Sequence, residues 1–167
     1  LMEGVEDIPG AALAEGIDWN WETFPEYLDA LEEMPRVMDI ATQVPHGSVR
    51  AYVMGERGAR NEDPTPDDLV EMAKIVQEGI EAGALGFTSS RTMLHRALDG
   101  EPVPGTFAGA DELIAMGKAV AEAGGGVIEV ASDIGLGGLE GNFGSDIDWM
   151  RELASDHGLT VTYALNQ

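Results

Sequence analysis

Polar side chains that could take part in chemistry follow four apolar segments of the chain. His46 comes after the first segment, the stretch SSRTMLH after the second, Ser132 and Asp133 end the third, and Asn166 and Gln167 end the fourth. Hydroxyl, imidazole, guanidinium, carboxyl and amide groups are the groups that bind the polar parts of a small molecule. We therefore predict substrate-binding roles for His46, Ser89, Ser90, Arg91, His95, Asp133, Asn166 and Gln167. In this set Arg91 is the group suited to bidentate pairing with a substrate carboxylate.

Metal-ligand spacing is absent from the sequence. The three histidines are widely separated, there is no H-x-H or H-E-x-x-H motif, and there is no cysteine. His46 as a hydrogen-bonded structural group and His95 as a salt-bridge partner remain open alternatives, and His157 suits the dipole at a helix end. Glu129 lies inside an apolar segment, so we expect it to have a partner or to face a cavity. The glycine-rich stretch 135–144 lacks both phosphate-binding registers, and we interpret it as a mobile loop that could cover a site.

The composition favours one globular domain and disfavours two classes of partner. The chain has 167 residues, of which 44% are hydrophobic. Its 9 Lys and Arg against 31 Asp and Glu give a formal net charge of -22, which repels nucleic acid and anionic membranes. The start LMEGVEDIPG has no basic region followed by an apolar one, and cysteine is absent. These features lead us to expect a cytoplasmic location.

Apolar periodicity and helix-capping residues divide the chain into alternating elements. Residues 1–22 have no clean period and predict a loop-like connecting arm, in which Trp19 and Trp21 anchor the segment. The predicted strands are 37–44, 84–89, 127–132 and 159–165. The predicted helices start at Thr23 and end before Pro35, start at Thr65 and end at Gly83, cover 111–123, and start at Ser145 and end at Gly158. The segment that starts at Ser48 fits either element, and we favour a helix.

This alternation predicts an α/β fold with parallel strands joined by helical crossovers. Two architectures fit, an open doubly wound sheet and the central part of a (β/α)8 TIM barrel. A complete barrel takes about 250 residues, so we expect a barrel segment of a longer polypeptide. In that reading residues 23–167 form the partial barrel and residues 1–22 the connecting arm.

Several blocks carry a family resemblance. WETFPEYLDALEEMP, VPHGSVRAYVMG, TPDDLVEMAKIVQEGIEAGALGFTSSR and VPGTFAGADELIAMGKAVAEAGG resemble the central part of the N-acyl-D-amino-acid deacylase (D-aminoacylase) branch of the amidohydrolase superfamily, within amidohydrolase family 3. The resemblance implies a metal-dependent (β/α)8 barrel that hydrolyses an amide bond with metal-activated water, with zinc as the expected cofactor. It also implies that the H-x-H pair and a metal-binding cysteine precede this segment and that the catalytic aspartate follows it.

The chain departs from the pattern of that family at three single positions and in one turn. The resemblance places histidines at the ends of the last two strands, where this sequence has Ala131 and Leu165, and a lysine where it has Gln167. Alanine and leucine cannot bind zinc. The family's Ser-Thr-Gly turn reads TSSRTMLHR here, which suggests altered substrate recognition.

The leading hypothesis is an amidohydrolase-like hydrolase acting on an N-acyl (D-)amino acid or a related amide. Its expected partners are a small-molecule amide substrate and the remainder of the barrel or a companion chain. The alternative is a noncatalytic barrel segment whose open strand edges serve assembly, or a family member that has lost the usual metal site.

Overall fold

Four parallel strands form one sheet in the order of the sequence. The computed structural model describes residues 2–133 and 143–164. Its strands are β1 (Val44–Pro45), β2 (Gly86–Arg91), β3 (Val127–Ser132) and β4 (Thr160–Tyr163), and each pairs in parallel with the next. A doubly wound sheet reverses its strand order at a switch point. The described strands show no such reversal, which is the arrangement expected of a barrel segment.

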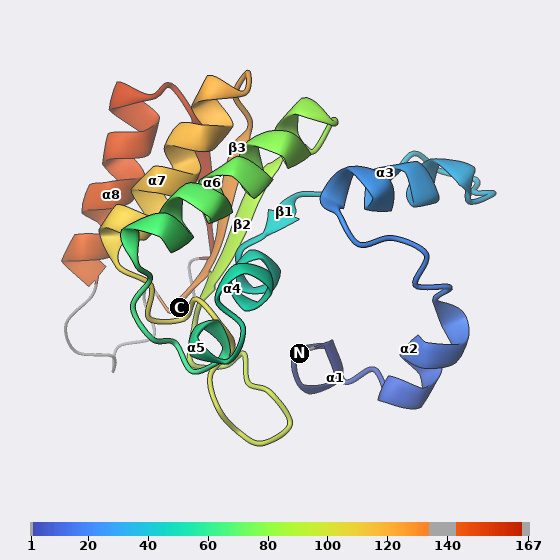
Figure 1. Ribbon diagram of the computed structural model, residues 1–167. Helices are drawn as coiled ribbons and strands as arrows, with labels where there is room; N and C mark the ends of the chain where they lie inside the picture. Colours follow the sequence, from blue (N-terminus) through green and yellow to red (C-terminus); the bar gives the residue numbers. More distant parts are fainter. Residues whose placement is uncertain (1, 134–142, 165–167) are drawn as a thin grey trace.

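Three helices pack side by side on one face of this sheet (Figure 1). They are α6 (Pro66–Glu81), α7 (Ala110–Glu122) and α8 (Phe143–Asp156), and each follows one strand and precedes the next. Apolar side chains of all three helices and of the strands meet in one core. Its fully buried members include Val76, Phe87, Met116, Ile128 and Leu153. The predicted α/β class with helical crossovers is confirmed.

The helices begin close to where their sequence signals place them. The Thr65 side chain accepts the Asp68 backbone N–H while Asp68 accepts the Thr65 backbone N–H, and Pro66 takes the first helical position. Arg57 and then Thr65 stabilise the carboxylate of Asp68 and lower its pKa to about 2. An equivalent capping box at Thr23 starts α3 (Phe24–Glu33). The helix α8 differs, because it begins at Phe143, before the predicted cap at Ser145.

The segment for which the sequence left helix and strand open is helical. It forms α4 (His46–Met54), followed after Gly55 by the short α5 (Glu56–Ala59). The favoured interpretation is thus confirmed. The helix α4 begins directly after β1, so His46 lies at the carboxyl end of a strand, as predicted.

The predicted strand over residues 37–44 is wrong except for its last residue. Only Val44 and Pro45 pair with β2, and before them a single backbone bond runs from the Leu85 N–H to the Thr42 carbonyl. Val37, Met38 and Ile40 are 103%, 72% and 49% exposed. Apolar residues in a row indicate a strand only where a neighbour supplies a ladder of hydrogen bonds, and residues 37–43 have, within the described part of the chain, only the bond to Thr42 from that neighbour.

The first 22 residues are more helical than the loop-like arm that the sequence predicted. They contain α1 (Met2–Val5) and α2 (Gly10–Gly16), and in Figure 1 they lie beside the sheet rather than among its covering helices. Trp21 contacts Tyr27 of α3 with ring centroids 5.2 Å apart, so it anchors the arm to α3. Trp19 contacts Trp21 with tilted rings but is 57% exposed. The division into an arm of residues 1–22 and a barrel segment of residues 23–167 stays a prediction.

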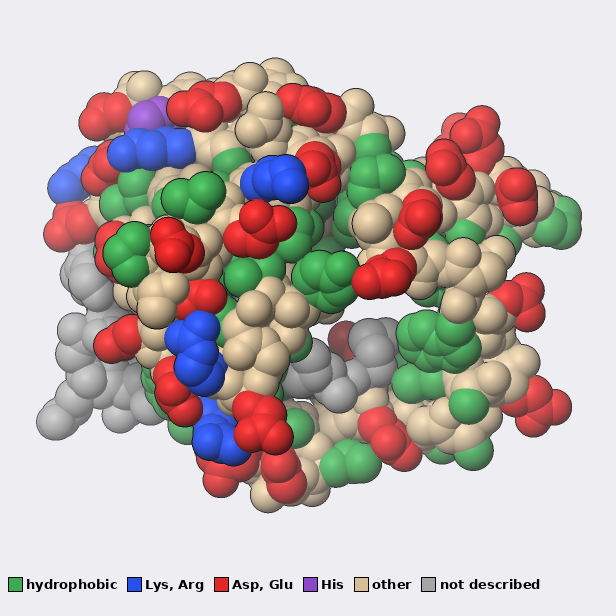
Figure 2. Space-filling model, in the orientation of Figure 1, with side chains coloured by type: hydrophobic (Ala, Val, Ile, Leu, Met, Phe, Trp, Pro, Cys, Tyr) green, Lys and Arg blue, Asp and Glu red, His purple; other side chains and the backbone are tan. Residues whose placement is uncertain are grey.

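The surface reflects the acidic composition. Figure 2 shows Asp and Glu side chains spread over the visible face, with fewer Lys and Arg between them. Among the described residues, no helix combines the length and apolar character needed to cross a membrane.

Candidate active site

Successive residues of β2 point to opposite faces of the sheet. Phe87 and Ser89 are buried on the face that the helices cover, at 1% and 3% exposure. Thr88 and Ser90 point the other way, and in the ladder they pair with Glu129 and Ala131 of β3. Glu129 is exposed on this open face, and its expected partner or cavity stays a prediction. In a (β/α)8 barrel the open face of such a sheet lines the interior, and ligands bind at its carboxyl end.

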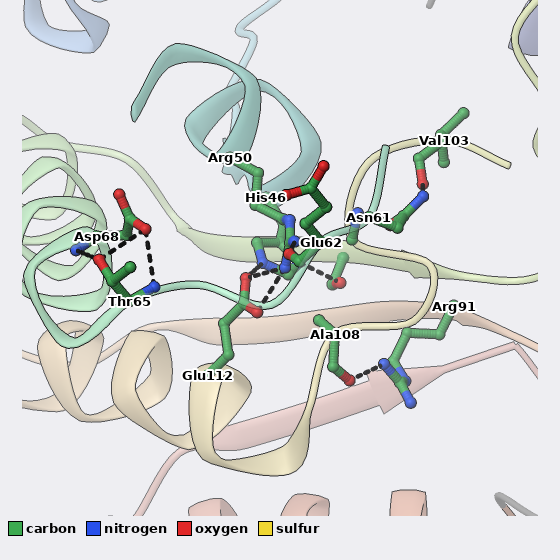
Figure 3. Close-up of polar contacts among 12 residues, drawn as sticks. His46, Arg50, Asn61, Glu62, Thr65, Asp68, Arg91, Val103, Ala108 and Glu112 are labelled. Carbon is green, nitrogen blue, oxygen red and sulfur yellow. Dashed lines mark hydrogen bonds and ion pairs between the residues drawn. The ribbon is translucent and has the colours of Figure 1, made fainter. Parts of the chain in front are cut away.

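A buried polar cluster lies on the covered side of β2 (Figure 3). Ser89 Oγ lies 2.8 Å from His46 Nδ1, and His46 Nε2 lies 2.8 Å from Glu112 Oε1. Arg50 Nη1 contacts both oxygens of Glu112 at 2.7 and 2.5 Å, and Arg50 Nη2 donates to the carbonyl of Glu62. We call His46, Arg50, Ser89 and Glu112 the Glu112 cluster. It joins the first turn of α7 to α4 and to the end of β2.

Burial and charge fix the protonation of the Glu112 cluster. Burial lowers the pKa of His46 and outweighs the neighbouring Glu112, so the imidazole is neutral. Burial also acts to raise the pKa of Glu112, but the hydrogen bond from His46 and the charge and hydrogen bonds of Arg50 outweigh it and lower that pKa. The His46 Nε2–H therefore donates to the Glu112 carboxylate, and the Ser89 O–H donates to Nδ1. Both ring nitrogens have protein partners, and His46 is 1% exposed.

The second serine of β2 holds a second histidine on the open face. Ser90 Oγ lies 2.6 Å from His95 Nδ1, and both residues are half-buried. Within residues 2–133 and 143–164, no partner contacts the Nε2 of His95. The structure thus brings together two of the residues that the sequence singled out and leaves one ring nitrogen available.

The loop that carries His95, residues 92–109 between β2 and α7, is anchored at its start by Asp133. The hydroxyl of Thr92 donates to one oxygen of this carboxylate, and the backbone N–H of Met93 donates to the other at 2.8 Å. Asp133 follows β3, so the loop is held by the neighbouring strand. The carboxylate that the sequence proposed for substrate binding has both oxygens occupied by this loop.

Asn61 anchors the far end of the same loop. Its Nδ2 donates to the carbonyls of Pro102 and Val103 at 3.3 and 3.2 Å, and its Oδ1 accepts the N–H of Gly105 at 2.8 Å. Sequence reasoning missed this residue. Its backbone φ of 57° fits asparagine, which tolerates the left-handed region better than most residues, and the stretch RNEDP around it carried only a general loop signal.

The guanidinium of Arg91 is engaged inside the protein. Its Nε and Nη2 contact Asp146 Oδ1 at 3.0 and 2.9 Å, and its Nη1 donates to the carbonyl of Ala108 at 2.6 Å. The side chain is 7% exposed. It ties the end of β2 to α8 and to the end of the loop, and a substrate carboxylate would have to compete with Asp146 for it.

The remaining predictions concern the end of the chain, the glycine-rich stretch, His157 and a metal site. Asn166 and Gln167, together with Leu165, lie outside the described residues, as does nearly all of the glycine-rich stretch. His157 lies just after the end of α8. Among the described residues, no group of three or more His, Cys, Asp or Glu side chains could hold a metal ion, and Ala131 supplies no ligand atom.

Solved structures of deacylases share this fold. A D-aminoacylase crystal structure superposes with a TM-score of 0.66 at 21% identity. The match covers 93% of this chain and 30% of that chain. The zinc and phosphonate complex of N-acyl-D-glutamate deacylase from Bordetella bronchiseptica gives a TM-score of 0.64 at 21% identity over 92% of this chain and 30% of that chain. The four described strands are therefore part of a (β/α)8 barrel of the amidohydrolase type.

Sequence relatives point the same way. An uncharacterized protein of Mycobacterium tuberculosis is 30% identical over 117 residues, which is 65% of this chain and 19% of the relative. The D-aminoacylase of Alcaligenes xylosoxydans xylosoxydans is 33% identical over 79 residues, which is 46% of this chain and 15% of that enzyme. The chain thus spans less than a fifth of these curated relatives. The model of the amidohydrolase family matches residues 1–167, and the chain belongs to that family.

Proposed function

We propose that this chain is the central barrel segment of a hydrolase that cleaves the amide bond of an N-acyl D-amino acid or a related amide. The observation that carries the proposal is the amidohydrolase family match over residues 1–167. The similarity to D-aminoacylase and to N-acyl-D-glutamate deacylase supports this class of substrate. Fold alone would not justify it, because barrels of this kind host many reactions.

The described residues contribute the wall of a substrate site at the carboxyl end of β2. Ser90 and His95 offer a hydroxyl and an imidazole on the open face. The loop that carries His95 is fixed by Asp133 and Asn61, so these groups are held in place before a substrate arrives. Arg91 and the Glu112 cluster hold the strand end and the loop from the covered side.

A metal cofactor fits the family better than it fits these residues. The related structures were solved with zinc or with copper chloride, and metal ions in hydrolases lower the pKa of a bound water. The described residues hold no group of three candidate ligands. A metal-activated water would therefore depend on ligands outside the described residues, and the residues described here would bind and orient the amide.

A second candidate function is an assembly role without hydrolysis. Ala131 lies at a strand end of the open face without a ligand atom, and β1 and β4 each pair with one strand among the described residues. Open strand edges are surfaces for pairing with another segment or chain. This alternative predicts a stable complex and no turnover.

The test is amide hydrolysis by the intact protein. We expect release of free amine from at least one member of a panel of N-acetyl-D-amino acids with apolar, acidic and basic side chains, and slower release from the L-enantiomers. Zinc content is measured on the same preparation, and a chelator is applied to it. Absence of amine release from the entire panel, with zinc supplied, would contradict the proposal and favour the assembly role.

A further inference from the structure

The loop between β2 and α7 contains a short two-stranded ribbon, residues 95–103. The Val103 N–H donates to the His95 carbonyl at 3.3 Å, and Arg96 and Pro102 form an antiparallel bridge. The ribbon therefore holds His95 opposite Val103, while the imidazole of His95 contacts the open-face end of β2. Any group that fixes the second strand of the ribbon also sets the position of His95.

Asn61 bonds to three backbone groups in and beside that second strand. Its Nδ2 donates to the carbonyls of Pro102 and Val103 at 3.3 and 3.2 Å, and its Oδ1 accepts the Gly105 N–H at 2.8 Å. We propose that Asn61 is a positioning residue of the substrate site, which holds the ribbon at one spacing from the end of β2. This inference rests on the proposed amide hydrolysis and adds to it a residue that acts on substrate binding through the loop.

The boundary between the ribbon and α5 offers little apolar packing. A cavity of about 340 Å³ lies between residues 56–61 and residues 99–107, and four of the side chains that line it are charged. Leu98, at the turn of the ribbon, is 72% exposed. Burial of apolar surface is the usual source of cohesion between two segments. Because little is buried here, the side-chain bonds of Asn61 are the main tie between the ribbon and the end of α5.

The backbone of Asn61 allows its side chain to be removed without strain. Its φ is 57°, in the left-handed region that glycine adopts freely and alanine does not. Asn61→Gly thus removes the three side-chain bonds and keeps the backbone conformation. Asp7 offers a matched control, because it is exposed in the arm and has a φ of 54°. Asp7→Gly makes the same kind of substitution outside the loop and α5.

The experiment measures hydrogen exchange and steady-state kinetics of the intact protein on its best amide substrate. In Asn61→Gly, exchange of the Gly105 amide and of the ribbon amides should be about tenfold faster. KM should rise by about tenfold while kcat stays within about twofold, because a loosened wall weakens binding of the substrate and of the transition state alike. Asp7→Gly should match the wild type in both measurements. Unchanged exchange in the ribbon of Asn61→Gly, or a wild-type KM despite faster exchange, would overturn the proposal.

A binding measurement separates this proposal from the proposed function. Calorimetric titration uses the best substrate of the panel, or N-acetyl-D-leucine where no member is hydrolysed. Weaker binding by Asn61→Gly than by the wild type supports the positioning role even without turnover, and then only the proposed function fails. If turnover is observed and the two proteins bind equally, amide hydrolysis stands and the role of Asn61 is overturned. Absence of both turnover and binding in the wild type would contradict both proposals.

Discussion

Two neighbouring serines of β2 make the same kind of bond and reach opposite environments. Ser89 bonds His46 Nδ1 at 2.8 Å on the covered face, and Ser90 bonds His95 Nδ1 at 2.6 Å on the open face. The first imidazole is also bonded through Nε2 to a buried carboxylate, whereas the second has no described partner there. The two sites differ in burial and in whether the second ring nitrogen has a partner. These two features, more than the Ser–His contact, separate a structural histidine from one available for chemistry.

The largest expected effect comes from removing the carboxylate of the Glu112 cluster. Glu112→Ala leaves the Arg50 guanidinium and the His46 Nε2–H buried without their partner, and breaking a buried ion pair from one side costs about 3–5 kcal/mol. We expect the urea midpoint of the intact protein to fall and hydrogen exchange in α4 and α7 to rise.

The control for this change lies on the same helix. Glu122 is exposed near the end of α7, so Glu122→Ala should change the free energy of unfolding by no more than about 0.5 kcal/mol. Equal stability of the Glu112→Ala and Glu122→Ala variants would mean that the cluster does not hold α4 to α7.

The second prediction concerns pH and tests the neutral state of His46. The groups facing its ring are Glu112 of α7, Arg50 of α4 and, at longer range, Arg91 of β2. Burial lowers the pKa of His46 in the folded state below its ordinary value of 6.5. Below that value the unfolded chain binds a proton that the folded chain does not, so stability should decrease as pH falls through 6.5. The limit for one proton is about 1.4 kcal/mol per pH unit.

Urea midpoints at pH 7.5 and 5.5 measure this slope. In His46→Gln the slope over this interval should be smaller, because the titrating group is gone. The lowered pKa of Glu112 also makes stability fall with acid, but only below its ordinary value of 4.5, so the two groups act in separate windows. An unchanged slope in His46→Gln would show that His46 does not titrate with unfolding.

Local signals in the sequence predicted most of the fold. Capping residues such as Thr65, followed by proline and an apolar stripe, placed the helices because those signals act within a few residues. The strand over 127–132 was predicted correctly for a related reason, since its β-branched Ile128 and Val130 are buried under the helices. The strand prediction was wrong for residues 37–43 because a strand needs a neighbouring strand to pair with. A local sequence pattern does not show where that neighbour lies.

The candidate site could be predicted only in part. The structure places Ser90 within β2 and brings it into contact with His95, while their substrate-binding role stays a prediction. The sequence pattern did not reveal that Arg91 pairs with Asp146, which lies 55 residues away, or that Asn61 holds the loop of residues 92–109. Both contacts join segments far apart in the sequence, so their partners follow from the packing of α8 and α5 rather than from spacing.

The smallest expected effect is also the most direct test of the comparison. Ser89→Ala leaves the buried Nδ1 of His46 without a donor, which should cost about 1–3 kcal/mol. Ser90→Ala removes the same atom on the half-exposed open face, where water can replace it, and should cost about 0.5 kcal/mol or less. Urea unfolding of the two variants side by side gives the difference. If both variants lose the same free energy of unfolding, the two faces of β2 are equivalent in burial. His46 and His95 would then not differ as a buried structural histidine and an accessible one.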